Sequence, residues 1–161
     1  MALVRDMLGN YRITGETTDA DILKAAEDIL HQRLQRQGTG ITRPSDAADL
    51  LKARLGAKVH EVFCVIFLDT RHRIIAVEDL FHGTIDGAEV HCRVIAKRSL
   101  ELNAAALIVA HNHPSGEPEP SRADRVLTDR IKDSMALLDI RLLDHLVVGS
   151  TVVSMAERGW L

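Results

Sequence analysis

The spacing of apolar residues changes along the chain and divides it into a front third and a larger remainder. Residues 1 to about 18 have no clear period and are interpreted as an arm. From 19 to about 37, apolar residues recur at helical spacing, and Gly38 ends that helix. A second helix is predicted from about 45 to 55, with Ser45 as its N-cap and Gly56 just beyond its end. The inward residues of the first helix are predicted to be Ile22, Ala26, Ile29 and Leu34.

Beyond this point the pattern alternates strands with helices. Residues 62–68 and 104–110 are unbroken apolar runs, typical of strands that are buried on both faces. Further strands are predicted at 74–77, 142–148 and 151–154, so that turns at 69–72 and 149–150 close two hairpins. Two helices are predicted at 88–103 and about 121–138, with inward residues Cys92, Ile95, Ala96 and Leu100 in the first and Leu127, Ile131, Met135 and Leu138 in the second. This order predicts an α/β (α+β) fold, a mixed β-sheet with flanking helices, and a small N-terminal helical appendage.

The composition is that of a globular protein. With 161 residues, 46% apolar and 27% charged, the chain is long enough for one well-cored domain. Lys plus Arg (20) against Asp plus Glu (23) gives a formal net charge of -3, which is not the basic footprint of a DNA-binding protein. Aromatic residues, at 3%, are too few for rows of base-stacking platforms. The local basic cluster Arg93, Lys97 and Arg98 is interpreted as a solvated helix face.

The cysteines and the N-terminal residues bear on the compartment. Cys64 and Cys92 lie in apolar surroundings without CxxC spacing, so we expect buried free thiols in a reducing environment. The first residues show neither the apolar core nor the small-residue cleavage site of a secretory signal. No apolar stretch approaches the length of a membrane span. We therefore expect a cytoplasmic protein that does not act at a membrane.

The candidate metal-ligating residues lie in the segment 111–124, HNHPSGEPEPSRAD. His111 directly follows an apolar run and His113 lies two residues later, so both side chains project to one side of an extended segment. The loop that follows contains a glycine and three prolines, which restrict its backbone, and Asp124 lies in the first turn of the next helix. Two imidazoles and one carboxylate leave a fourth tetrahedral position open, which is typical of catalytic rather than structural zinc.

Ordinary structural interpretations of this segment stay open. Two histidines at a strand end are often solvent-facing or satisfied within a core. The pattern Ser121-x-x-Asp124 is also a capping box that starts a helix. The two interpretations are compatible, because a capped helix start is a rigid place from which to present a ligand.

These residues resemble a known family motif. His111-x-His113-Pro114 followed by Ser121-x-x-Asp124 is similar to the H-x-H-P…S-x-x-D motif of JAMM (MPN-type) zinc metallopeptidases, including the ten residues between the second histidine and the aspartate. The wider sequence resembles the RadC-like (JAB domain) bacterial branch of that superfamily. The stretches that carry this likeness are Glu61-Val62-Phe63, Phe67-Leu68-Asp69, Gly83-Thr84, residues 110–116 and Leu143-Asp144-His145. The predicted division is an arm and helix at 1–42 and one RadC-like JAMM/MPN domain at 43–161.

The resemblance implies a JAMM/MPN (cytidine-deaminase-like) fold that binds one zinc ion per chain through His111, His113 and Asp124. Glu61 matches the upstream glutamate of the family, the base that accepts a proton from the attacking water. Ser121 matches the serine that helps to stabilise the oxyanion. Enzymes of this family cut amide or isopeptide bonds, so the resemblance implies a peptide or isopeptide substrate.

Several neighbouring polar residues have two interpretations. Asp144 and His145 interrupt an aliphatic strand, either as a satisfied polar pair at a strand edge or as support for the metal ligands. Asn112 and Ser115 either line the site or shape its turn. The residues expected to lie at the surface or to pack without binding are His60, Tyr11 and Trp160.

Three functions are compatible with these residues. The first is a zinc-dependent metallopeptidase or isopeptidase-like hydrolase. The second is a metal-dependent nuclease or DNA-repair-associated protein, and the third is a non-catalytic interaction module of the same fold. The complete ligand set argues against the third function. The acidic balance, and residues 1–42 without a convincing Gly-x-Gly hairpin, argue mildly against the second. The oligomeric state stays open.

Overall fold

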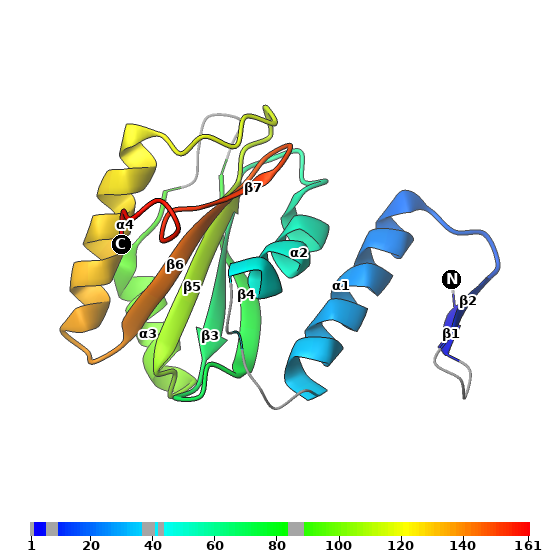
Figure 1. The fold of residues 1–161 in the computed structure, drawn as a ribbon, viewed down its shortest axis with the longest axis horizontal. Coiled ribbons are helices and arrows are strands. Elements are labelled where there is room, and N and C mark those ends of the chain that lie inside the picture. The colour runs from blue at the N-terminus through cyan, green and yellow to red at the C-terminus, as the bar shows by residue number, and fades with distance from the viewer. Residues whose placement is uncertain (1, 6–9, 37–40, 42–43, 84–88) are drawn as a thin grey trace.

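The computed structural model describes residues 2–5, 10–36, 41, 44–83 and 89–161, and the structural statements below concern these residues. One five-stranded sheet forms the centre of the molecule, with α3 and α4 on one face and α2, with α1 beyond it, on the other (Figure 1). The elements are β1 Ala2–Arg5, β2 Tyr11–Thr14, α1 Asp19–Arg36, α2 Pro44–Leu55, β3 Val62–Leu68, β4 Ile74–His82, α3 Cys92–Glu101, β5 Ala106–Asn112, α4 Arg122–Ala136, β6 Arg141–Val148 and β7 Val152–Ser154. The predicted α/β fold with a mixed sheet and flanking helices is confirmed.

The strand order in the sheet is β4-β3-β5-β6-β7. β5 and β6 run parallel and α4 connects them, whereas the other neighbours are antiparallel. All seven residues of β3 and all seven of β5 are buried, because these strands are covered by helices on both faces. The carboxyl end of β5 therefore lies in the middle of the sheet, beside the start of β3 and the N-terminus of α4.

Several predicted boundaries are wrong, each for a local reason. β4 continues to His82, five residues past the predicted end, because it pairs with the whole length of β3. β5 runs from 106 to 112 rather than from 104 to 110, since Asn103, with φ 52°, and the next two residues form the turn out of α3. His111 thus lies within the strand. α3 begins at Cys92 rather than 88, a position that lies outside the described residues.

Some predicted inward positions are also wrong. Leu100 is 58% exposed, and Ser99 is buried in its place, with its hydroxyl donating to the Ile95 carbonyl at 2.7 Å. Leu138 lies beyond the end of α4 and is half-exposed. In α1, Ile22 is exposed and Ala25 is buried. The Leu34 side chain is outside the described part of the chain.

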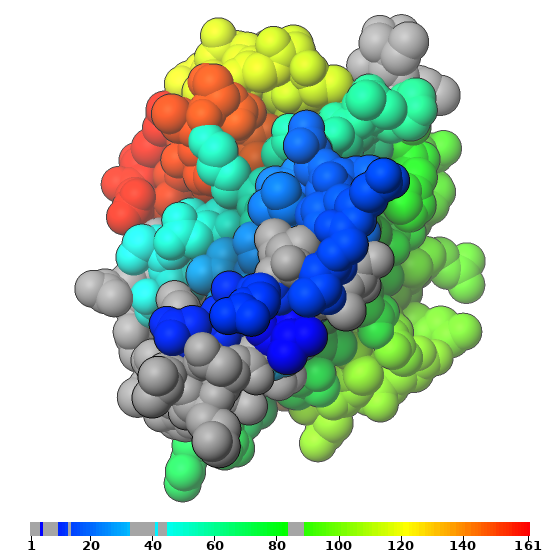
Figure 2. Space-filling model, turned by 90° about the vertical axis from the view of Figure 1, so that its right-hand side faces the viewer, coloured from blue at the N-terminus to red at the C-terminus, as the bar shows by residue number. Residues whose placement is uncertain are grey.

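The front third differs most from its prediction. The arm contains an antiparallel hairpin of β1 and β2, and the residues of this hairpin and α1 spread over the α2 side of the molecule (Figure 2). α2 begins at Pro44, a favoured first helical residue, so Ser45 lies inside the helix rather than at its cap. None of the helices in the described ranges combines the length and apolar character that crossing a bilayer requires.

The predictions for the cysteines and the basic cluster have mixed outcomes. Cys64 is a fully buried free thiol, but Cys92, at the exposed start of α3, is half-buried. In the basic cluster, Arg98 donates to both carboxylate oxygens of Glu78, at 2.6 and 2.8 Å. Arg93 and Lys97 are exposed, as predicted for a solvated helix face, whereas Arg98 is partly buried and pairs with β4.

Candidate metal centre

Three residues that are separated in the sequence meet at the carboxyl end of β5. His111 is the penultimate residue of β5, His113 follows the strand, and Asp124 is the third residue of α4. Each offers one ligand atom, and these atoms all lie within 4.8 Å of one another. We call these three residues the metal triad, because such a group could hold a metal ion.

The distances within the metal triad fit a shared ion. Nε2 of His111 lies 3.0 Å from Nε2 of His113 and 3.2 Å from Oδ1 of Asp124, and His113 Nε2 lies 3.6 Å from Asp124 Oδ2. Ligand atoms about 2.1 Å from a tetrahedral zinc ion are separated by about 3.4 Å from one another. The separation of the two Nε2 atoms is close to this value, but the two imidazoles approach different oxygens of Asp124, so the carboxylate has to turn for one oxygen to share an ion with both.

His113 is oriented by the loop that follows it. Its Nδ1–H donates to the Glu117 carbonyl at 2.7 Å, which leaves Nε2 to face the other ligands. Its backbone N–H donates to the carbonyl of Val148 at 2.9 Å, and the Ser150 N–H donates to the Gly116 carbonyl at 2.7 Å. The loop is therefore fixed to the turn between β6 and β7.

Gly149 permits this close approach. A Cβ atom at that position would lie 2.6 Å from the Gly116 carbonyl oxygen and 2.8 Å from the Pro118 nitrogen, both backbone atoms. Gly116 itself has a φ of +83°, a conformation that favours glycine. Two glycines thus allow the His113 loop to lie against the β6–β7 turn.

Buried side chains contact His111 at Nδ1, the ring nitrogen that faces away from the other two residues of the metal triad. Its Nδ1 lies 2.8 Å from Nε2 of His145, whose Nδ1 lies 2.6 Å from the hydroxyl of Thr128. The Thr128 hydroxyl also donates to the backbone carbonyl of Asp124 at 2.6 Å. The ring of Phe63 stacks on His111, with 6.3 Å between centroids and 7° between planes. Burial lowers the pKa of His145 well below its ordinary value.

Asp124 combines both predicted roles, as a cap and as part of the metal triad. Its Oδ2 accepts from the backbone N–H and the hydroxyl of Ser121, both at 2.7 Å, and Ser121 Oγ accepts from Asp124 N–H at 3.1 Å. The predicted capping box is confirmed. Burial alone would raise the pKa of Asp124, but hydrogen bonds with His111 and His113 hold it well below its usual range. The carboxylate therefore stays charged where the two imidazoles converge.

Glu61 lies at the mouth of the site. In the pairing of β3 with β5, Phe63 lies opposite His111, and Glu61 directly precedes β3, two residues before Phe63. The hydrogen bond with Asp124 raises the pKa of His113, and the nearby negative charge of Glu61 adds to this shift. The structure thus brings Glu61, the predicted base, close enough for its charge to act on His113.

Asn112 shapes the backbone that carries Glu61. Its Oδ1 accepts from Val62 N–H at 2.8 Å, and its Nδ2 donates to the carbonyls of Lys58 and His60 at 3.2 and 3.0 Å. The amide is buried and its polar atoms bond to this backbone, so of the two interpretations the structure favours the shaping of a turn. His60 is exposed, as predicted.

Asp144 and His145 have separate roles. Asp144 accepts from its neighbour's N–H at 2.7 Å, from Ala156 N–H at 3.0 Å and from the Ser154 hydroxyl at 2.6 Å, so it is a satisfied polar group that holds the turn after β7. His145 contacts His111 instead. The first interpretation therefore applies to Asp144 and the second, contact with the metal triad, to His145. Ser115 is exposed, and its Oγ accepts from Glu117 N–H at 3.4 Å.

The residues that the sequence did not reveal are Thr128 and Gly149. Thr128 lies four positions after Asp124 on α4, so it shares a face with that residue, and this spacing is the one signal that could have identified it. The role of Gly149 depends on how closely the 113–118 loop approaches, which the sequence does not encode locally.

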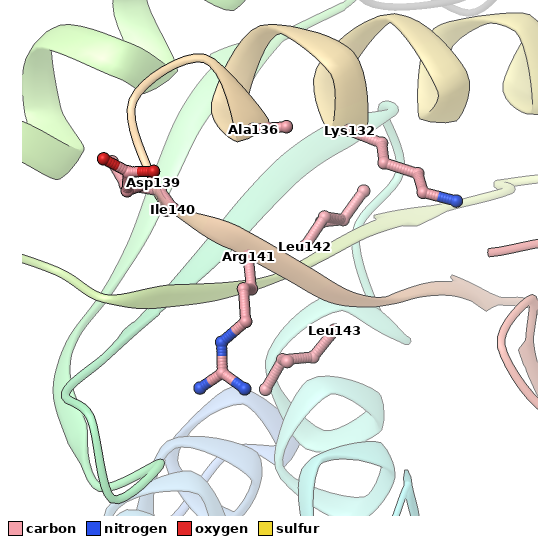
Figure 3. A pocket seen from close by; sticks show the side chains of 7 residues that line it. All are labelled: Lys132, Ala136, Asp139, Ile140, Arg141, Leu142 and Leu143. Carbon is pink, nitrogen blue, oxygen red and sulfur yellow. The ribbon is translucent and has the colours of Figure 1, made fainter.

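Two cavities lie near α4, and the metal triad lines neither of them. A cavity of about 480 Å³ lies where α4 leads into β6, and Leu142 and Leu143 point to opposite sides of the strand there (Figure 3). This cavity is lined by Lys132, Ala136, Asp139, Ile140, Arg141, Leu142 and Leu143, a set without histidine or cysteine.

A second cavity of about 630 Å³ lies next to the loop before α4 and includes Arg122, Arg125 and Trp160. Trp160 packs under the Arg125 guanidinium, which lies 4.1 Å from the ring centroid. This contact fits the expectation that Trp160 packs. Tyr11, in β2, is 38% exposed.

The fold and the metal triad define an α/β domain with a candidate metal centre at the carboxyl end of its central strand. A family model of the RadC-like JAB domain matches residues 41–160, and the chain belongs to this family. The resemblance to the RadC-like branch of the JAMM/MPN superfamily is thereby confirmed.

Similar bacterial proteins carry the name UPF0758. The chain is 48% identical over 151 residues to one from Vibrio cholerae serotype O1, with 94% of this chain and 95% of that protein covered. It is 53% identical over 143 residues to one from Xanthomonas oryzae pv. oryzae and 54% identical over 140 residues to one from Thioalkalivibrio sulfidiphilus. The matches cover 86% and 87% of this chain but 64% and 62% of those two proteins, less than two thirds of their length.

Proposed function

We propose that this protein is a zinc-dependent hydrolase of the metallopeptidase or isopeptidase type. The observation that carries the proposal is the convergence of two imidazole Nε2 atoms and one carboxylate oxygen within 4.8 Å at the carboxyl end of β5. Two nitrogens and one oxygen are a donor set that zinc prefers, and three protein ligands leave one position for substrate or water. When bound, a zinc ion would supply Lewis acidity and a water nucleophile near neutral pH.

The residues around the ion would divide the remaining work. Glu61 would accept a proton from the attacking water and deliver it to the leaving nitrogen, as the carbon–nitrogen bond breaks and the water oxygen joins the carbonyl carbon. Ser121 would orient the Asp124 carboxylate through the capping box and, as the family resemblance implies, would help to stabilise the oxyanion. The raised pKa of His113 fits a ligand that exchanges a proton for a metal ion.

The substrate would reach the site over the surface next to α4. Glu61 and His113 are partly exposed at the mouth of the site, and the cavity with Arg122, Arg125 and Trp160 adjoins the loop that leads to Asp124. A peptide or an isopeptide-linked protein offers both an amide carbonyl for the ion and side chains for such a cavity. We propose one of these as the substrate class.

The test combines metal analysis with a comparison of substrates. Purified protein is expected to contain about one zinc ion per chain, and Glu61→Gln is expected to keep the zinc and lose turnover. Glu89→Gln, at an exposed position before α3, is the matched control and should keep both. Peptide, isopeptide-linked and DNA substrates are offered to the wild-type protein and to both variants. The proposal is contradicted by protein that takes up no zinc, or by Glu61-dependent cleavage of DNA alone.

A further inference from the structure

We propose that Thr128 and His145 are positioning residues that fix which ring nitrogen of His111 carries its proton, so that Nε2 is free to bind the metal ion. The proposal rests on the proposed metal site and gives a role to two buried side chains that lie behind it. Both residues are almost fully buried, at 1% and 0% exposed.

The first proton is assigned by the Asp124 backbone carbonyl, which only accepts hydrogen bonds. It lies 2.6 Å from the Thr128 hydroxyl oxygen, and a hydroxyl has a single proton to donate. Two oxygens at this distance without a proton between them would repel each other. The Thr128 proton therefore points at the carbonyl rather than at Met155 Sδ, a weaker acceptor 3.5 Å away, and Thr128 Oγ1 presents a lone pair to His145.

The second proton follows from the first. His145 Nδ1 lies 2.6 Å from Thr128 Oγ1, so this nitrogen must be the donor and carries a proton. The other nitrogen, Nε2, faces the imidazole of His111 at 2.8 Å. A buried imidazole whose two nitrogens contact a hydroxyl and a second imidazole has no anionic partner and is neutral. Its Nε2 is therefore an acceptor.

The third proton decides the state of His111. Because His145 Nε2 accepts, His111 Nδ1 carries the proton that it donates across the 2.8 Å contact. With Nδ1 protonated, Nε2 is the one ring nitrogen of His111 that can offer a lone pair to a metal ion, and it lies 3.0 Å from His113 Nε2 and 3.2 Å from Asp124 Oδ1. The opposite tautomer would put a proton on Nε2 and block the ligand atom.

The two histidines of the metal triad reach the same state through different partners. His113 donates its Nδ1 proton to a backbone carbonyl, whereas His111 donates to a side chain that is oriented by α4. We call the chain of hydrogen bonds from the Asp124 carbonyl through Thr128 and His145 to His111 the relay. It connects two ligands of the metal triad that come from different elements, α4 and β5. Hydrogen-bond partners of metal-bound histidines typically contribute about 10- to 100-fold to metal affinity.

Thr128→Val tests the relay, because valine keeps the branched shape and removes the hydroxyl. Thr128→Ser is the matched control, since it restores both hydrogen bonds in a smaller side chain. We expect about a 10- to 100-fold loss of zinc affinity in Thr128→Val and a much smaller loss in Thr128→Ser. Nitrogen-15 NMR of the histidine rings in zinc-free protein should show protonated Nδ1 on both His111 and His145 in the wild type, and mixed tautomers in Thr128→Val.

The two measurements separate this inference from the proposed function. Wild-type protein that binds no zinc would contradict the function, while the ring spectra would still decide the tautomers. Wild-type zinc affinity in Thr128→Val, or a proton on Nε2 of His145 in the wild type, would overturn the relay. Should Thr128→Val fail to fold, the wild-type spectrum and the Thr128→Ser affinity decide alone.

Discussion

Two polar clusters lie on opposite faces of the same sheet, and they differ in how donors and acceptors are balanced. On the α2 face, Arg54 pairs with Glu27 and, at 2.7 Å, with Asp79, and we call these three residues the Arg54 cluster. Here one guanidinium donates to two carboxylates, and Lys24 and Lys58 lie 3.6 and 3.9 Å from them, so every acceptor faces a donor. On the α4 face, the metal triad brings together acceptor atoms from two imidazoles and a carboxylate. Those acceptors need a cation or a proton between them.

This difference shows how a metal site can be distinguished from a polar cluster that only stabilises the fold. Both groups are largely buried and contain charged residues, so burial and composition do not distinguish them. The direction of each hydrogen bond does. In the metal triad the outer nitrogens are occupied by Glu117 and His145, and the inner ones point at one another. We therefore expect changes in the metal triad to affect metal binding, and changes in the Arg54 cluster to affect folding.

The largest effect is expected for His113→Ala. Structural zinc sites with four ligands bind with about 10–16 kcal/mol, so loss of one ligand should cost about 3 kcal/mol, a factor of at least about 100 in affinity. The free energy of unfolding of the zinc-free protein should change little. Competition with a zinc chelator and urea unfolding measure the two quantities. Wild-type zinc affinity in this variant would remove His113 from the site.

Arg54→Met should give the opposite pattern. It leaves two carboxylates partly buried without their guanidinium, which should cost about 2 kcal/mol of unfolding free energy once partial solvent screening is allowed for. Zinc stoichiometry should stay unchanged. The control is Arg73→Met, whose half-exposed arginine pairs with Asp69 at 2.6 Å and should cost less than about 1 kcal/mol. Loss of zinc from Arg54→Met would show that the two clusters are coupled.

A smaller effect on the metal triad alone is expected for Gly149→Ala. The added Cβ would meet backbone atoms of Gly116 and Pro118, so the loop that orients His113 has to move. We expect zinc affinity to fall about tenfold, or about 1.4 kcal/mol. Ser150→Ala is the control, since that residue binds the loop through its backbone N–H. Equal affinities for the two variants would mean that the close approach does not position His113.

The smallest effect should come from pH. The hydrogen bond with Asp124 raises the pKa of His113 above its ordinary 6.5, so a proton competes with the metal already above that pH. Zinc affinity should be complete well above the raised pKa and should fall, by roughly fivefold per pH unit, as the pH decreases through it. Chelator competition at several pH values measures this slope. The slope should be shallower in His113→Ala and unchanged in Arg54→Met.

The sequence predicted those parts of the fold and of the candidate site that depend on local patterns. The bounds of β3 follow from seven consecutive apolar residues, and the start of α4 follows from the capping box of Ser121 and Asp124. The end of β5 was missed because His111 and Asn112 are polar residues in a strand, where partners from other elements satisfy them. The relay through Thr128 depends on how α4 packs against β6. No local pattern contains that contact.

Anomalous X-ray diffraction at the zinc edge, on crystals grown with equimolar zinc, tests the central claim most directly. We expect one strong peak per chain, about 2.0–2.2 Å from Nε2 of His111, Nε2 of His113 and a carboxylate oxygen of Asp124. A map without a peak there, or with zinc bound elsewhere while these side chains keep their present contacts, would contradict a metal centre at the end of β5.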